Sequence, residues 1–423
     1  MDYQTRVVDK QLKHLLTILP AIAVEGAKGV GKTASVKRLS HNVYSLDVES
    51  TRLNTQADPE IILHGDSPIF VDEWQRVPPI WDVVRRAVDD GAPPGRFLLA
   101  GSATPKDPLS IHSGAGRIVR LLMRPMSFPE RGVEQPTVSF SSLLSDEETG
   151  IEGHTDIGVF EYVREIFTSG FPGIRSQLPE ARPYLLDAYV DRIIDHDIPD
   201  AGGSIRRPRS LRNWLAAYAA ATATTATEAA IRRAASPEEA DVPSKPTSLA
   251  YKELLQRIWV LDPIQAWEPS FSHLKRLGKT PKHHLVDPGL AARLVGATPS
   301  SLIRGTGDPE FPRDGTFLGA LFESLVAQTL QVLSANFGGR VAHMRTKDGD
   351  REVDFIIERS DSCFLAIEAK ASPAIRPTDV VHLNWLEQKM PNRIIEKVII
   401  NTGYSAFRRP DGVAVIPLAL LGP

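Results

Sequence analysis

A glycine-rich segment close to the start of the chain has the residue types and spacing of a phosphate-binding loop. It matches the pattern G-x-x-x-x-G-K-[ST] in full and follows an apolar run. Glycines let successive backbone N–H groups converge on a phosphate chain, and the helix start behind them adds the positive end of its dipole. The residues expected to surround bound ATP are Gly26, Ala27, Lys28, Gly29, Val30, Gly31, Lys32 and Thr33.

Two residues of this loop and two carboxylates farther along predict how the nucleotide is handled. Lys32 should reach the β- and γ-phosphates, and the Thr33 hydroxyl should bind Mg²⁺. The apolar run Ile69–Val71 leads directly into Asp72 and Glu73. We expect Asp72 to hold Mg²⁺ through water and Glu73 to polarise the water that attacks ATP. An acidic pair at a strand end is often only a solvated loop, but the phosphate-binding loop favours the catalytic interpretation.

An arginine farther along is a candidate for stabilising the transition state. Arg117 follows Gly116 and precedes the apolar run Ile118–Leu122. An arginine there can act on the γ-phosphate as a finger supplied by a neighbouring subunit, which would make the protein a homo-oligomer. A surface ion pair is the alternative role, and Arg120 and Arg124 are competing candidates for the finger.

A second group of chemically capable residues lies near the C-terminus. Glu368 and Lys370 are two residues apart on a predicted strand, so their side chains leave the same face of the sheet. Asp354, on the neighbouring predicted strand, can converge on that face, and Glu323 can approach from a predicted helix. Carboxylates held together bind a hard divalent ion, and a lysine beside them can orient or deprotonate water. Glu352 is expected to face the other side of its strand.

This constellation resembles the active site of PD-(D/E)xK nucleases. The resemblance implies that Asp354 and Glu368 bind the metal. It also places the lysine that acts on water at Lys370 and the accessory acid at Glu323. The alternative is an ordinary amphipathic strand pair with charged edges. Many such folds are binding scaffolds, so a nuclease-like fold does not by itself establish cleavage.

The surrounding pattern predicts the elements that position these residues. Residues 1–135 alternate short apolar strands with helical segments, which favours a parallel sheet with crossover helices. The predicted strands are Ala21–Glu25, Val43–Val48, Ile69–Val71, Phe97–Ala100 and Ile118–Leu122. Residues 131–155 are poor in apolar side chains and are interpreted as a linker.

Residues 156–305 are predicted to be mainly helical. Helices are expected over Leu211–Ala235 and Pro246–Arg257. Two short strands, Trp259–Trp267 and His283–Val286, follow them, and this order suggests a winged-helix module. A basic cluster upstream is a candidate for phosphate contacts with duplex DNA. Its members are Arg206, Arg207, Arg209 and Arg212. The alternatives are a solvated helix start and a winged helix that binds a protein partner.

Residues 315–423 are predicted to form a third domain of α/β type. A helix over Phe317–Leu333 comes first, and a second helix, Thr378–Lys389, lies between the last two strands. The predicted strands are Val341–Arg345, Glu352–Glu358, Phe364–Ala369 and Lys397–Asn401.

Composition excludes several classes of protein. The formal net charge is −3, so any contact with DNA needs a local basic patch. The single cysteine, Cys363, excludes a disulfide within the chain and a cysteine zinc cluster. The apolar stretch Leu15–Val24 is broken by Pro20, and no run approaches the roughly 18 apolar residues of a membrane span. We therefore expect a cytoplasmic protein that does not contact a membrane.

In this context the motifs resemble those of prokaryotic AAA-like ATPases that carry a C-terminal domain of unknown function with a nuclease-like core. The segments that carry the resemblance are Asp72-Glu73-Trp74-Gln75, Gly101-Ser102-Ala103, and Gly116-Arg117 leading into Arg124-Pro125-Met126-Ser127-Phe128-Pro129-Glu130. Residues 167–172 and 189–198 look like the family's joint between the ATPase and the winged helix. By the same resemblance Ser102 senses the γ-phosphate, with a helix cap as the alternative role.

The resemblance implies three consecutive folds: an α/β AAA-type P-loop NTPase domain, a helical winged-helix segment, and an α/β restriction-endonuclease-like domain. The function it implies is Mg²⁺-dependent ATP hydrolysis by a DNA-associated protein, in which ATP-driven conformational change regulates the nuclease-like domain. The alternative is an ATP-dependent regulatory switch that binds protein partners and carries an inactive nuclease-like platform. The salt dependence of DNA binding separates the two, because phosphate contacts give a steep slope.

Overall fold

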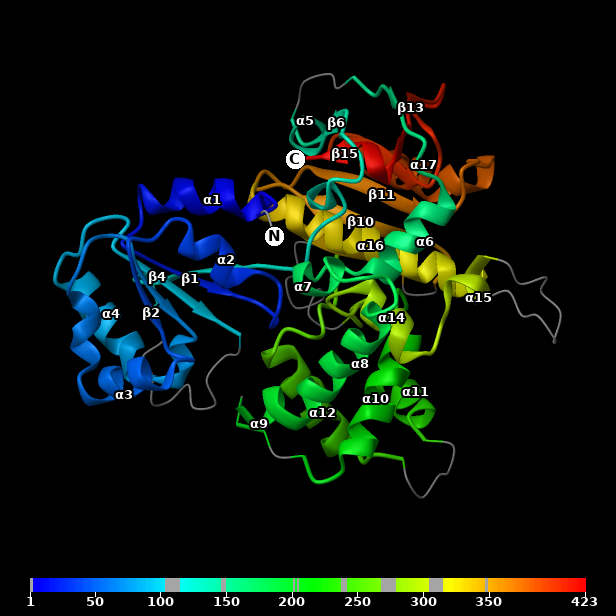
Figure 1. The fold of residues 1–423 in the computed structure, drawn as a ribbon. Helices are drawn as coiled ribbons and strands as arrows, with labels where there is room; N and C mark the ends of the chain where they lie inside the picture. The colour runs from blue at the N-terminus through cyan, green and yellow to red at the C-terminus, as the bar shows by residue number, and fades with distance from the viewer. Residues whose placement is uncertain are drawn as a thin grey trace. The chain divides into compact units, whose positions relative to one another are not determined.

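The structure is a computed structural model, and it describes residues 3–102, 115–145, 150–200, 202–203, 205–236, 242–267, 279–303, 315–346 and 349–423. These residues belong to two compact units, each built from separate stretches of chain (Figure 1). The first unit contains residues 1–125, 189–208 and 250–260, and the second contains residues 126–188, 209–249 and 261–423. The division into domains 1–135, 156–305 and 315–423 stays a prediction, and the stretch between residues 305 and 315 lies outside the described residues.

A five-stranded parallel sheet organises the first unit. Its order is β2-β3-β4-β1-β5. The strands are β1 (Ala21–Glu25), β2 (Asn42–Ser45), β3 (Ile69–Asp72), β4 (Phe97–Gly101) and β5 (Val119–Leu122). All five strands expected from the apolar runs are therefore confirmed, with small differences at their ends. The parallel arrangement brings the carboxyl ends of β1, β3 and β4 to the same edge of the sheet, where ligands bind in open α/β folds.

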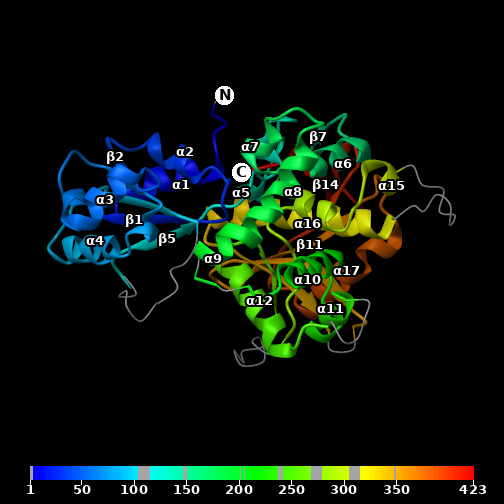
Figure 2. The same cartoon turned by 60° about the horizontal axis from the view of Figure 1, so that its bottom comes forward.

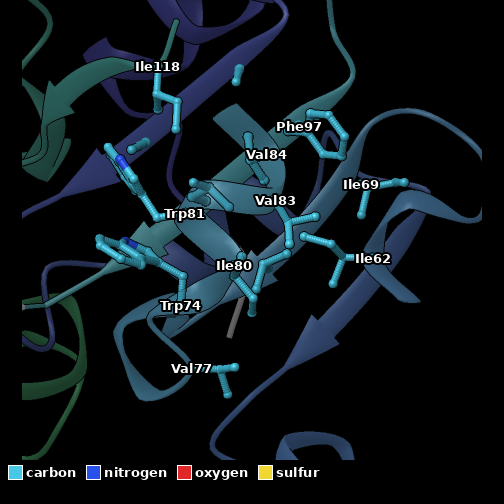
Figure 3. Packing of buried hydrophobic residues seen from close by; sticks show 14 of the residues in the cluster. Ile62, Ile69, Trp74, Val77, Ile80, Trp81, Val83, Val84, Phe97 and Ile118 are labelled. Carbon is cyan, nitrogen blue, oxygen red and sulfur yellow. The ribbon is translucent and has the colours of Figure 1, made fainter. Parts of the chain in front are cut away.

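Helices cover the sheet of the first unit, as crossover connections between parallel strands require. They are α1 (Val7–Leu16), α2 (Lys32–Lys37), α3 (Glu49–Ala57) and α4 (Pro79–Asp89). Figure 2 shows α1 and α2 on one side of β1 and α4 on the other. The packing of α4 is seen in Figure 3, where Trp81 lies between Trp74 and Ile118, and Ile80 and Val84 belong to the same buried cluster. The ring centroids of Trp74 and Trp81 are 4.6 Å apart. Because Trp74 lies in the turn after β3, this contact attaches the turn to the core.

An eight-stranded mixed sheet organises the second unit. Its order is β7-β13-β14-β12-β11-β10-β9-β8. The strands are β7 (Gly153–His154), β8 (Gln265–Ala266), β9 (Arg340–Arg345), β10 (Glu352–Glu358), β11 (Phe364–Lys370), β12 (Ile394–Asn401), β13 (Ser405–Arg408) and β14 (Ala414–Pro417). The long helix α16 (Gly315–Ala335) contacts β9, β10 and β11, and α17 (Val381–Lys389) contacts β10 and β11. The helices and strands expected over residues 317–401 are thus confirmed.

The interpretation of residues 131–155 as a linker is wrong. This stretch supplies β7, which pairs with β13, and β6 (Val138–Ser139), which pairs in parallel with β15 (Leu421–Gly422). A short helix, α5 (Phe140–Leu143), follows β6, and Phe140 is buried. Each of these strands has two residues, too few for any apolar periodicity to show.

The helical part of the chain differs from its prediction at two places. The helix expected over Leu211–Ala235 is divided into α10 (Pro208–Ala220) and α11 (Glu228–Ala234) by a turn in which Ala223 has a φ of 58°. The expected wing is represented by two isolated antiparallel bridges, Leu261 with Leu285 and Ile264 with Lys282. Within the first expected strand of that wing, Trp259–Trp267, residues Gln265 and Ala266 form β8, which joins the edge of the eight-stranded sheet.

Several further helices complete the described chain. They are α6 (Val159–Thr168), α7 (Pro172–Arg175), α8 (Arg182–Arg192), α9 (Ile198–Asp200), α12 (Lys245–Arg257), α14 (Pro288–Leu294) and α15 (Pro299–Ile303), with the π-helical turn η4 (Ile193–Asp197) between α8 and α9. Among the described residues, α16 alone has the length and apolar composition of a membrane span, and 61% of that window is buried inside the protein.

Candidate functional site

The glycines of the phosphate-binding loop have backbone conformations that other residues rarely adopt. The φ angles are 148° at Gly26, 80° at Gly29 and 101° at Gly31. A Cβ on Gly26 would also lie 2.1 Å from the carbonyl oxygen of Met123. Glycine is therefore required for the loop to turn between β1 and the start of α2 at Lys32.

The side chain of Lys32 lies within the loop that precedes it. Lys32 is 5% exposed, and its Nζ donates hydrogen bonds to the carbonyl oxygens of Gly26 and Ala27, each over 2.8 Å. Burial lowers the pKa of Lys32 to about 8, although the charges of Glu73 and Asp72 oppose the shift. The ammonium group is thus held where the loop encloses a ligand.

Thr33 and Asp72 meet at the carboxyl edge of the sheet. The Thr33 hydroxyl donates to Oδ2 of Asp72 over 2.8 Å. The other oxygen of Asp72, Oδ1, is buried and has no hydrogen-bond partner in the described part of the chain. Burial raises the pKa of Asp72, and the hydrogen bond from Thr33 only partly offsets this. An adjacent cation would favour the charged carboxylate, so a hydroxyl and an unsatisfied carboxylate oxygen fit the ligand chemistry of Mg²⁺.

Glu73 and Ser102 lie together beside this pair. Glu73 has a φ of 54°, which is an uncommon value for a non-glycine residue. Its Oε2 accepts hydrogen bonds from Nε2 of Gln75 over 2.5 Å and from the Ser102 hydroxyl over 3.2 Å. The structure therefore brings the expected catalytic glutamate and the expected sensor serine into contact. Ala103, the last residue of that motif, lies outside the described residues.

The candidate finger Arg117 takes part in a surface ion pair. Its Nε lies 2.8 Å from Oδ1 of Asp89, and its side chain is 47% exposed. The hydrogen bond from Arg117 lowers the pKa of Asp89. The competing Arg120 lies 3.5 Å from Glu25 and packs over the Trp81 ring. The role of a finger in a neighbouring subunit stays a prediction for all of these arginines.

Sequence reasoning missed a contact between the phosphate-binding loop and the π-helical turn η4. Nζ of Lys28 lies 2.6 Å from Oδ1 of Asp197, which is also 3.5 Å from Nε of Arg192. The Tyr189 hydroxyl donates to the carbonyl oxygen of Lys28 over 3.0 Å. Segments about 170 residues apart in sequence thus meet at the loop. Single π-helical turns often occur at functional sites.

In the second unit, the four residues expected to form a nuclease-like site come together. Nζ of Lys370 lies 2.6 Å from Oε2 of Glu368 and 3.9 Å from Oδ2 of Asp354. The Ala369 N–H donates to the same Asp354 oxygen over 3.0 Å. Glu323, from α16, reaches the group as well, and Glu323, Asp354 and Lys370 line a pocket of about 540 Å³. Thr222, Thr224 and Arg376 also line this pocket.

A buried lysine that the sequence did not reveal completes this group. Nζ of Lys282 lies 2.9 Å from Glu323, 2.9 Å from Glu352 and 3.0 Å from Asp354, and its side chain is 1% exposed. The expectation that Glu352 faces away from Asp354 is wrong, because residues two apart in a strand share a face. Lys282 stands in Thr-Pro-Lys-His-His, a sequence with no pattern that signals a buried cation.

The carboxyl groups around Lys282 and Lys370 have pKa values that shift in opposite directions. Burial favours the neutral form of Asp354, but the ammonium groups of Lys282 and Lys370 outweigh it and lower the pKa to about 2. Burial and the charge of Asp354 raise the pKa of Glu323 to about 8 and the pKa of Glu368 well above its usual range. Lys282 keeps its charge, because its carboxylates raise its pKa despite burial. No three His, Cys, Asp or Glu side chains among the described residues are placed as a metal-binding set.

A protein-family match covers the region of the chain that contains the first of these sites. Residues 19–131 match the AAA domain family. This chain carries an AAA-type ATPase domain. Residues 318–421 match a domain of unknown function, DUF4143, in keeping with the implied C-terminal domain, and residues 159–301 match a second one, DUF8612.

Two uncharacterized mycobacterial proteins are similar to this chain along almost its whole length. The uncharacterized proteins Rv2008c of Mycobacterium tuberculosis and Mb2031c of Mycobacterium bovis are each 25% identical over 99% of this chain and 84% of their own length. Among solved structures, the Walker-type ATPase PABY2304 of Pyrococcus abyssi has a TM-score of 0.40 at 16% identity, covering 68% of this chain and 94% of its own. RuvB of Thermotoga maritima has a TM-score of 0.26 at 16% identity, covering 64% and 94%.

Proposed function

We propose that this protein binds ATP with Mg²⁺ and hydrolyses it. The observation that carries the proposal is the contact between Thr33 and Asp72 beside a phosphate-binding loop that encloses the Lys32 ammonium group. Lys32 would exchange its two carbonyl partners for phosphate oxygens, and Thr33 and Asp72 would hold the metal. Mg²⁺ would neutralise charge that develops on the phosphates. Glu73 would accept a proton from the attacking water, and Ser102 would report on the γ-phosphate.

The test replaces Lys32 and a neighbouring lysine on the same helix. Lys32→Ala should reduce ATP turnover by roughly 10²–10³-fold, the usual loss when one group that stabilises transition-state charge is removed. Lys37→Ala is the matched control, because Lys37 is an exposed residue at the end of α2. Equal turnover by purified Lys32→Ala and wild-type protein would exclude this assignment.

The finer proposal is that the ATPase is associated with DNA and that nucleotide-driven change regulates the nuclease-like domain. Four arginines support it, because each is exposed to solvent in a short stretch of chain. They are Arg206, Arg207, Arg209 and Arg212. Binding to duplex DNA should weaken steeply between 50 and 200 mM salt, as expected for several phosphate contacts. Replacing Arg206 and Arg207 by Ala should flatten that salt slope, whereas replacing the exposed Arg76 and Arg86 should leave it unchanged.

For the C-terminal pocket we propose that Asp354 and Glu368 bind Mg²⁺ or Mn²⁺ and that Lys370 holds water or a phosphate oxygen for cleavage of DNA. The pocket and the contact between Lys370 and Glu368 support this. Lys370→Ala should then abolish Mn²⁺-dependent cleavage of linear, circular and single-stranded DNA while ATP hydrolysis continues. Cleavage that survives in Lys370→Ala protein would place the activity elsewhere or in a contaminant.

A second candidate function is an ATP-dependent switch that binds protein partners through an inactive nuclease-like platform. One observation favours it: the carboxylates of the pocket are already paired with two lysines. Under this function no cleavage occurs with any DNA in Mn²⁺ and ATP, and binding to DNA lacks a steep salt slope. Cleavage of DNA, or a steep salt slope in DNA binding, would instead support the DNA-associated ATPase.

A further inference from the structure

The Lys282 ammonium group has the surroundings that a metal ion would have. One oxygen from each of Glu323, Glu352 and Asp354 lies within 3.0 Å of Nζ. An Mg²⁺ or Ca²⁺ ion collects carboxylate oxygens in the same way, at roughly 2.0–2.6 Å. The lysine side chain is 1% exposed, so its ammonium group lies almost entirely among protein atoms.

The backbone of Lys282 holds this side chain in place. Its N–H donates to the carbonyl oxygen of Ile264 over 2.8 Å, and the Ile264 N–H donates back to the carbonyl oxygen of Lys282 over 2.9 Å. The lysine comes from the region that matches DUF8612, whereas Glu323, Glu352 and Asp354 belong to the region that matches DUF4143. Two family regions therefore contribute to one charge cluster.

The neighbouring Glu368 has a buried carboxylate oxygen that the described residues do not hydrogen-bond. It is 5% exposed, and its Oε1 has no hydrogen-bond partner within the part of the chain that the structure describes. The β10–β11 register pairs Phe355 with Ile367, which sets Asp354 opposite Glu368 at the next position. Side chains directly opposite in a sheet are about 4.5–5.5 Å apart at Cβ, so two carboxyl groups here need a cation or a proton between them.

From these observations we infer that Lys282 is an internal competitor of the divalent cation at the C-terminal site. Its ammonium group contacts Asp354, Glu323 and Glu352, and a divalent ion beside Asp354 would stand next to two lysines instead of one. Metal binding at Asp354 and Glu368 is therefore weak while Lys282 is in place and becomes strong when its charge is removed. The inference rests on the proposal that these two carboxyl groups are the metal ligands.

The experiment measures Mn²⁺ binding to the full chain by isothermal titration calorimetry and by electron paramagnetic resonance, without nucleotide. Every protein carries Asp72→Asn, which silences the metal site of the ATPase domain. Lys282→Met should bind Mn²⁺ at least about tenfold more tightly than the parent, since one nearby positive charge has been removed. Lys282→Arg keeps the charge and should bind as weakly as the parent. Lys279→Met, at a lysine whose Nζ contacts the backbone of Arg345, is the matched control and should change nothing.

Two further variants locate the ion and guard against misfolding. Adding Asp354→Asn to Lys282→Met should abolish the gain in affinity. Lys282→Met leaves three carboxyl groups without their cation, which could destabilise the fold. The double variant Lys282→Met/Glu352→Gln also removes one carboxylate. It therefore repeats the test with fewer unpaired negative charges. Mn²⁺ should raise the Tm of either protein, and Asp354→Asn should remove that rise.

The outcomes separate the inference from the proposal beneath it. Equal Mn²⁺ affinity in the parent and in both Lys282→Met proteins, lost on Asp354→Asn, would overturn the role of Lys282 and leave the metal site standing. No binding that depends on Asp354 in any of these proteins would overturn both. Tight binding only after the lysine charge is removed supports both.

Discussion

Gln75 donates a hydrogen bond from Nε2 to Oε2 of Glu73 over 2.5 Å, directly beyond the strand that ends in Asp72. The Ser102 hydroxyl donates to the same oxygen over 3.2 Å. The protein itself thus sets the direction of the Glu73 carboxylate, at a residue whose φ of 54° is already unusual. A glutamine at position 73 can accept both hydrogen bonds through its carbonyl oxygen, so Glu73→Gln removes the charge with little change in local structure.

We predict that Glu73→Gln binds ATP normally and hydrolyses it roughly 10²–10⁴-fold more slowly, the usual loss when a general base is removed. Fluorescence titration with an ATP analogue and a phosphate-release assay measure the two properties separately. Glu49→Gln, at an exposed position in the first turn of α3, is the control and should leave both unchanged. If Glu73→Gln fails to bind ATP, the division of roles between Asp72 and Glu73 is wrong.

The second prediction concerns Arg117. If it acts in a neighbouring subunit, ATPase activity per chain should rise with protein concentration, and Arg117→Ala should lose much of the roughly 10³–10⁵-fold effect of an arginine finger. Mixing Arg117→Ala with Lys32→Ala protein should restore some activity, since each chain supplies what the other lacks.

The control for Arg117 is a neighbouring arginine that shares its partner. Arg85 lies 2.9 Å from Asp89, the residue that also pairs with Arg117. Arg85→Ala should therefore match any effect that comes only from losing a surface ion pair, which contributes little to stability. Activity of Arg117→Ala equal to that of Arg85→Ala, or activity per chain that does not change with concentration, would contradict a finger at this position.

The third prediction concerns the ion pair between Lys28 and Asp197. Asp197 places a negative charge beside the loop that must receive phosphates and occupies the side chain of a loop lysine. Asp197→Asn should therefore tighten ATP binding by about two- to tenfold, the effect of a modest charge interaction near a surface. Asp200→Asn is the matched control, because Asp200 is 63% exposed and lies 3.5 Å from Lys28. Weaker ATP binding by Asp197→Asn would mean that the pair instead holds the loop in its binding shape.

The fourth prediction is a loss of stability in acid that depends on His343. Burial lowers the pKa of His343 to about 4, and the charge of Lys282 adds to the shift. An unfolded histidine has a pKa of about 6.5. Between these values the unfolded chain binds more protons than the folded one, so the free energy of unfolding falls as the pH falls from about 6.5 to about 4. Each pKa unit corresponds to roughly 1.4 kcal/mol, which gives about 2 kcal/mol between pH 6.5 and 5.

His343→Gln keeps a donor for the Thr280 carbonyl oxygen but does not titrate in this range. Its Tm should therefore fall less than that of the wild type between pH 7 and pH 5. His14→Gln, at an exposed histidine of α1, should follow the wild type. Parallel Tm curves for His343→Gln and the wild type would show that folding does not lower the pKa of this histidine.

The features that the sequence predicted correctly are those that depend on residues close together in the chain. Apolar runs located the strands β1 to β5, and the glycine pattern located the loop around Lys32, because both depend on neighbouring residues. The sequence also predicted the convergence of Glu323, Asp354, Glu368 and Lys370, although not what neutralises them. Lys282 and Asp197 were missed because a lone charged residue acquires its role only from partners that are 41 to 169 residues away. The turn at Ala223 was missed because its N–H bonds to the carbonyl oxygen of His283, far along the chain.

The pairing of β6 with β15 constrains the order in which the chain can mature. Val138 and Ser139 pair with Leu421 and Gly422 in a two-stranded sheet, and β7 pairs with β13 at the edge of the eight-stranded sheet. Both early strands therefore have partners that are synthesised much later. A ribosome adds about 5–20 residues each second, so residues 138–154 remain without their sheet partners for tens of seconds. Pairings of such sequence separation are slow to form and leave strand edges exposed to other chains. A fragment that begins at residue 315 would lack β6, β7, β8 and Lys282 from the outset, so these pairings could form only in a chain that includes the earlier segments.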